Sequence, residues 1–144
     1  MKKQDEMDDA LYQEIMQYCE EGDTAVEEDE YDSAIHAFQQ AFDLIPEPYQ
    51  DWEASTWVLF SLGEAQFFNE DYIAAKESLT AVMHCPNAIG NPLIHLRLGQ
   101  AQYELGNFSK AKDELMRAYM GQGEEIFDGE DEKYFNFLKQ EVDL

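Results

Sequence analysis

The chain has 144 residues, of which 32 are acidic and nine are basic, and its formal net charge is −23. A surface this negative repels nucleic-acid phosphates and anionic membranes, so we exclude both as partners and expect a basic or amphipathic segment of another protein. The alternative is that the acidic residues serve only to keep the protein soluble. Hydrophobic residues make up 44% of the chain, which is enough for one domain with a buried core. The sequence has no secretion-type leader, no apolar run of membrane-spanning length and only two cysteines, which favours a cytoplasmic protein.

The N-terminal half is predicted to form two helical hairpins. Either Asp8 or Asp9 can cap the first helix, and the partner helix is expected over residues 33–44, before the prolines that follow. From position 49, one long helix of about 20 residues is expected to run as far as Phe68. A helix over residues 72–84 then completes the second hairpin.

The C-terminal half is predicted to hold a third hairpin, over residues 92–121, and one further helix. The turn of this hairpin is expected at residues 105–107. The small residue Gly99 would let the two helices approach closely, with Leu115 filling the space beside it. The last helix is expected over residues 129–142, where its apolar side would cover the end of the hairpin.

The three hairpins carry a shared spacing, centred on Gly22, Gly63 and Gly99. Small and large apolar residues follow each glycine at matching offsets, and the glycines stand slightly further apart than the roughly 34 residues of a helix-turn-helix repeat. This pattern resembles the tetratricopeptide repeat family. The resemblance implies a single all-α domain over residues 1–144, a right-handed helical-hairpin solenoid. It implies repeats at about 15–48, 56–89 and 92–123 and a capping helix at about 129–142.

Motifs for catalysis are missing from the sequence. No nucleophile is paired with a base, and no phosphate loop is present. Two histidines, His36 and His84, lack the neighbouring ligands that a zinc site needs, and His95 stands where a large packing side chain is usual. The sequence therefore predicts a protein that is not an enzyme and that uses no cofactor or metal.

A groove is the better candidate for function. The resemblance implies that ligands lie along the concave surface formed by the first helix of each repeat. The aromatic residues Trp57, Phe60 and Phe68 exceed what packing requires there, and exposed aromatic side chains in a groove indicate recognition. The predicted partner-binding residues are Glu20, Asp23, Glu27, Trp57, Phe60, Glu64, Phe68, Arg97, Gln100 and Glu104.

The negative charge of this groove decides which ligand we expect. Members of the family that bind chaperone tails grip a terminal carboxylate with basic and amide side chains, and Arg97 alone matches that pattern, so an acidic tail is not expected. We predict instead a non-enzymatic module that captures a basic or amphipathic segment. Resemblance to small bacterial proteins suggests an immunity protein for a cationic toxin. The alternatives are a chaperone of type III secretion translocators and a homo-oligomer that buries the surface around Trp52 and Trp57.

Overall fold

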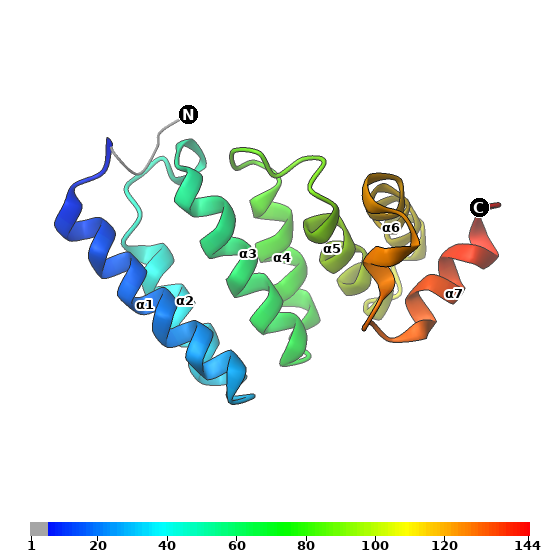
Figure 1. Ribbon diagram of the computed structural model, residues 1–144, viewed down its shortest axis with the longest axis horizontal. Helices are drawn as coiled ribbons and strands as arrows, with labels where there is room; N and C mark the ends of the chain where they lie inside the picture. Colours follow the sequence, from blue (N-terminus) through cyan, green and yellow to red (C-terminus); the bar gives the residue numbers. More distant parts are fainter. Residues whose placement is uncertain (1–5) are drawn as a thin grey trace. The chain divides into compact units, whose positions relative to one another are not determined.

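The computed structural model describes residues 6–144, and the regular structure in this range is helical throughout (Figure 1). Seven α-helices and short 3-10 turns follow one another along these residues, which confirms the all-α fold class. The chain divides into two compact units, one ending at Ala88 and the other running from Ile89 to Leu144. The single domain predicted from the sequence stays a prediction.

The first unit consists of two hairpins. Its helices are α1 (Asp9–Glu27), α2 (Tyr31–Asp43), α3 (Glu53–Phe68) and α4 (Tyr72–Val82), with a short 3-10 turn, η2 (Tyr49–Asp51), before α3. Helix α1 packs on α2 and α3 packs on α4, while α2 also packs on α3 and joins the two hairpins. The predicted cap is confirmed at Asp8, whose side chain accepts the backbone N–H of Leu11 at 3.2 Å.

The second unit contains one hairpin and a C-terminal segment. Helices α5 (Pro92–Glu104) and α6 (Phe108–Gln122) form the hairpin, and η3 (Glu124–Phe127) and α7 (Glu132–Glu141) follow. Both η3 and α7 pack against α6, and η3 also contacts α5. The buried side chain of Leu138 anchors α7.

The same close contact occurs inside each hairpin. A Cβ atom added at Gly22 would lie 2.6 Å from the ring of Phe38, and one at Gly63 would lie 2.7 Å from the side chain of Leu79. In the third hairpin, a Cβ at Gly99 would lie 2.8 Å from Leu115. Such distances are far inside van der Waals contact, so each hairpin needs a glycine opposite a large apolar side chain. The close approach predicted at Gly99 is confirmed.

The hairpin turns also share one geometry. Asp29, Glu70 and Gly106 have φ values of 59°, 64° and 79°, in the left-handed region. The backbone amide after each of them donates to the carbonyl five residues back, at 2.8 to 2.9 Å. These bonds satisfy carbonyl groups at the helix end, as in a Schellman motif, and glycine is the residue that best tolerates this conformation. The first two hairpins use an acidic residue instead.

The predicted long helix from Tyr49 to Phe68 is wrong. Trp52 adopts an extended conformation (φ −103°, ψ 133°) and separates η2 from α3. The hydroxyl of Ser55 donates to the carbonyl of Tyr49 at 2.6 Å, a side-chain bond that replaces a helical one. Because Trp52 is only 5% exposed, the break also places a large apolar side chain in the core.

The predicted core role of His95 is confirmed. Its side chain is buried, and its Nε2 accepts the backbone N–H of Gly90 at 2.9 Å. The other ring nitrogen, Nδ1, lies 2.6 Å from a carboxylate oxygen of Glu114. Since Nε2 is an acceptor, Nδ1 carries the proton and donates to Glu114. The histidine therefore ties the loop before α5 to α6.

Replacing Gly99 by alanine should destabilise the protein by up to about 2 kcal/mol, because an overpacking cost of about 1–3 kcal/mol against Leu115 is only partly offset by the gain of about 1 kcal/mol that alanine brings to a helix. Denaturant unfolding measures the change. In a Leu115→Ala background the same substitution should cost less, because the two side-chain atoms at 2.8 Å are gone and only the backbone nitrogen, at 3.1 Å, remains close. An equal penalty in both backgrounds would show that the contact is not the cause.

Replacing Glu70 by glycine should stabilise the protein by about 1 kcal/mol, because a left-handed conformation is strained for a residue with a Cβ atom. Thermal unfolding tests this. The Glu70→Gln variant removes the same charge but keeps the strain, so it serves as the control and should gain much less. A gain of equal size in Glu70→Gln would assign the effect to charge.

Candidate functional site

Side chains from three helices surround a hollow of about 300 Å³ in the first unit, which we call the α1–α3 hollow. Helices α1 and α3 supply most of its walls, and α2 supplies the ring of Phe38. Because residues four apart share a face of a helix, Asp23 and Glu27 point the same way from α1, and Glu64 and Phe68 do so from α3. Its lining residues are Asp23, Val26, Glu27, Phe38, Ser61, Glu64, Ala65 and Phe68.

Negative charge is concentrated on the α1 wall of the hollow. Partial burial raises the pKa of the Asp23 carboxyl above its ordinary value, and the carboxylates of Glu27 and then Glu20 raise this pKa further. The sequence contains no Lys or Arg between Lys3 and Lys76, so no basic residue stands nearby along the chain. Ionised Asp23 is therefore held among like charges, which a cation would relieve.

An aromatic ring borders the carboxylates. Phe68 remains 39% exposed although it ends a helix of the core. Its ring centroid lies 5.8 Å from that of Tyr31 and 5.7 Å from that of Phe67, which is itself buried. These contacts hold the ring of Phe68 in place with part of its surface open to solvent.

The structure brings together four of the ten predicted partner-binding residues, namely Asp23, Glu27, Glu64 and Phe68. Glu20 lines a separate hollow between α1 and α2. Trp57 is 37% exposed and Phe60 is half-buried, and neither lines the α1–α3 hollow.

The remaining three predicted residues, all on α5, are engaged by the C-terminal segment of the second unit. Arg97 and Gln100 are buried, and both donate to Oε1 of Glu130, at 2.6 and 2.8 Å. Glu104 accepts from Nζ of Lys133 at 2.6 Å. Sequence reasoning missed Glu130 and Lys133, because the spacing of residues within a helix does not indicate where a later segment will dock.

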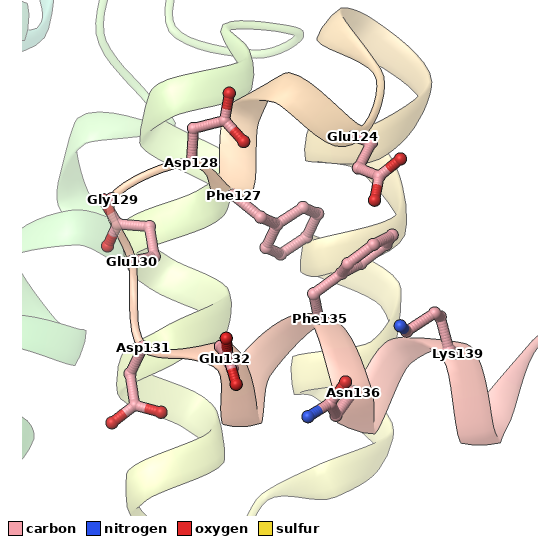
Figure 2. Close-up of a pocket in the computed structure, with 10 residues that line it drawn as sticks. All are labelled: Glu124, Phe127, Asp128, Gly129, Glu130, Asp131, Glu132, Phe135, Asn136 and Lys139. Atoms are coloured by element: carbon pink, nitrogen blue, oxygen red, sulfur yellow. The ribbon is translucent and has the colours of Figure 1, made fainter.

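A second hollow, of about 430 Å³, lies between η3 and α7 (Figure 2). Phe127 and Phe135 stack there with ring centroids 4.7 Å apart, and Figure 2 shows carboxylates distributed around them. The ammonium group of Lys139 lies 4.7 Å from the centroid of Phe135. A cation of the chain thus already contacts this aromatic pair.

The two thiols are poor nucleophiles. Cys19 and Cys85 are both buried and free. Burial raises the pKa of the Cys19 thiol to about 12, helped by the charge of Asp23, and raises that of Cys85 to about 11. Both therefore stay protonated near neutral pH, and the thiolate is the reactive form.

Within residues 6–144, no three His, Cys, Asp or Glu side chains are grouped as metal ligands would be. Over the same range, no helix combines the length and the apolar character needed to cross a membrane.

Part of the chain matches a known protein family. The family model for the tetratricopeptide repeat matches residues 18–48 and 93–120. No curated protein sequence matches the chain.

Solved structures of tetratricopeptide domains are similar to this chain over 90% of its length or more. The domain of Arabidopsis OM64 has 14% identity and a TM-score of 0.72, over 92% of this chain and 99% of that one. The C-terminal domain of a putative FK506-binding protein from Plasmodium falciparum has 18% identity and a TM-score of 0.71, over 90% and 87%. The second such domain of human RPAP3, in complex with the HSP70 peptide SGPTIEEVD, has 14% identity and a TM-score of 0.68, over 90% and 96%. Identities this low show the fold alone, which is the predicted helical-hairpin solenoid.

Replacing Asp23 by asparagine should raise the thermal midpoint at pH 7. The folded-state pKa of Asp23 lies above its unfolded value, so folding disfavours the ionised form; this penalty is complete above the raised pKa and disappears as the pH falls below the ordinary value. The gain should therefore vanish near about pH 3, below the ordinary pKa of aspartic acid. The Glu14→Gln variant removes one charge elsewhere on α1 and serves as control. A gain that persists unchanged at pH 3 would contradict the assignment.

Proposed function

We propose that this chain, a member of the tetratricopeptide repeat family, is a non-enzymatic protein-binding module whose α1–α3 hollow captures a basic segment of a partner protein. The observation that carries this proposal is the combination of carboxylates from two helices with the exposed ring of Phe68 in one hollow. The carboxylates would contribute electrostatic attraction, and the ring would contribute an apolar surface for packing.

A lysine or arginine side chain suits both parts of the hollow. Its apolar stem can pack on the ring of Phe68 while its charged end meets Asp23 and Glu27. A cation placed over an aromatic ring gains about 0.5–2 kcal/mol, depending on how far it is desolvated. The bound cation would also stabilise ionised Asp23, whose carboxyl lies among like charges. A basic side chain therefore gains binding free energy from the ring of Phe68 and also from the carboxylate of Asp23.

The similar domain of human RPAP3 binds an HSP70 peptide, SGPTIEEVD, that carries acidic residues. The α1–α3 hollow has the opposite requirement, because its own charged lining residues are Asp23, Glu27 and Glu64. Like charges across an interface cost several kcal/mol in unfavourable cases, so the hollow should reject such a peptide. A peptide of basic character is the complementary choice.

As the physiological setting, we propose an immunity protein that neutralises a cationic toxin. A net charge of −23 would accelerate the encounter with a basic protein. A secretion chaperone remains the alternative, since it needs the same affinity for an amphipathic segment. The homo-oligomer alternative would use Trp57, which is 37% exposed, more than Trp52, which is 5% exposed.

The test uses a short synthetic helix of lysine and leucine with amphipathic spacing, and a counterpart with glutamate in place of lysine. Calorimetry should detect binding of the lysine peptide, weakened by salt. The Asp23→Asn, Glu27→Gln double variant should weaken binding roughly tenfold, and Phe68→Ala should do about the same.

The matched control is the Asp9→Asn, Glu14→Gln double variant, which removes the same charge from the other end of α1. Binding as tight as that of the unmodified protein is expected from it. If the control loses as much affinity as the double variant in the hollow, the general field of the protein and not this site binds the peptide. Equal affinity for the glutamate peptide would reject a basic ligand altogether. Circular dichroism verifies that every variant is folded.

A further inference from the structure

The second unit contains a face that corresponds in sequence to the acidic face of α1 in the first unit. Arg97, Gln100 and Glu104 lie two residues before, one residue after and five residues after Gly99. The same three offsets from Gly22 give the exposed acidic residues of α1. On α5, however, the side chains of Arg97 and Gln100 are buried, and both bond to a residue from later in the same chain.

The first contact between α5 and the later segment is made by the carboxylate of Glu130. Nη1 of Arg97 donates to Oε1 of Glu130 at 2.6 Å, and Nε2 of Gln100 donates to the same oxygen at 2.8 Å. Arg97 also donates to the side-chain oxygen of Gln100 at 2.9 Å, which fixes the pair in register. Because Arg97 is only 7% exposed, the carboxylate of Glu130 compensates its charge where water has little access.

The second contact is made by the ammonium group of Lys133, three residues after Glu130. Nζ of Lys133 lies 2.6 and 3.3 Å from the two carboxylate oxygens of Glu104. It also lies 5.9 Å from the ring centroid of Tyr103 and 5.2 Å from that of Tyr134. A lysine is thus bound by a carboxylate and by aromatic rings, the chemistry that a basic side chain from a partner would need.

The segment that supplies both charges is joined to α6 through two glycines in the left-handed region. Gly123 has a φ of 77° and Gly129 a φ of 81°, and a Cβ atom at either would meet no neighbour within 4 Å. The glycines are therefore needed to direct the chain back over α5 and not to make room for packing. Tyr103 then receives the rings of Tyr134 and Phe137, at centroid distances of 5.4 and 5.2 Å.

We propose that residues 124–138 are a ligand bound in cis, and that this face of α5 is a second peptide-binding site, selective for a carboxylate three residues before a lysine. The site goes beyond the proposed function, because it lies on another unit and requires charges of both signs. A ligand joined by a short linker has an effective concentration in the millimolar range. An external segment therefore competes only weakly until the contacts made in cis are lost.

The test adds a fluorescent peptide with the sequence of residues 127–141 to the full chain. The Glu130→Gln, Lys133→Gln double variant, whose own segment has lost both charges, should bind this peptide at least about tenfold more tightly than the unmodified protein. A further Arg97→Gln substitution should remove the gain. A peptide with glutamine at the position of Glu130 should lose affinity in the same way.

The matched control is the Glu132→Gln, Lys139→Gln double variant, which removes one charge of each sign from residues 127–141 and keeps both side chains that bond to α5. It should bind the peptide as weakly as the unmodified protein. Equal binding by the two double variants, or no binding by a folded Glu130→Gln, Lys133→Gln variant, would overturn the proposal.

Hydrogen exchange on the unmodified protein provides a test that does not depend on a variant folding. If the segment is a ligand bound in cis, α7 should detach and rebind while α5 stays folded. The backbone amides of α7 should therefore exchange faster than those of α5. An excess of unlabelled peptide should increase the exchange of α7 further. If α7 and α5 share one protection and the peptide changes neither, the segment is a structural cap and no ligand.

Discussion

The hairpins depend on one contact, a glycine on the first helix placed against a large apolar side chain on the second. It occurs at Gly22 with Phe38, at Gly63 with Leu79, and again in the third hairpin. The side chain fills the volume that a Cβ atom would take, so the two helix backbones lie closer than other residues would allow. Since the contact involves only one face of the first helix, the adjacent face is left for other purposes.

The two units use that adjacent face differently. In the first unit it carries Asp23 and Glu27 and borders a hollow with an exposed aromatic ring. In the second unit it carries Arg97, which is buried and bonded to Glu130 from a later segment of the chain. One repeat geometry therefore yields a surface suited to an external cation and a surface that already holds a charged segment. The difference comes from the side chains at corresponding positions and not from the backbone.

Sequence reasoning found the features that local spacing encodes. The glycine-centred repeats, the hairpin turns and the face that carries Asp23 all follow from helical periodicity. It failed at Trp52, where a hydroxyl-to-carbonyl bond and the burial of a large ring interrupt an otherwise helical pattern. It also placed Arg97 in an open groove, because the bond to Glu130 joins residues far apart in the sequence. Contacts of that kind depend on where a distant segment docks, and periodicity within one helix contains no information about it.

The acidic residues in the hairpin turns have a consequence for the field around the first unit. Asp29 and Glu70 follow the C-terminal ends of α1 and α3, where the helix macrodipole is already negative and where the last turn of each helix carries no basic residue. Charge, dipole and backbone strain all disfavour acids at these positions, yet both hairpins have them. Their combined potential reinforces that of Glu27 at the same end of the hairpins. An approaching cation would therefore be attracted toward the C-terminal ends of α1 and α3.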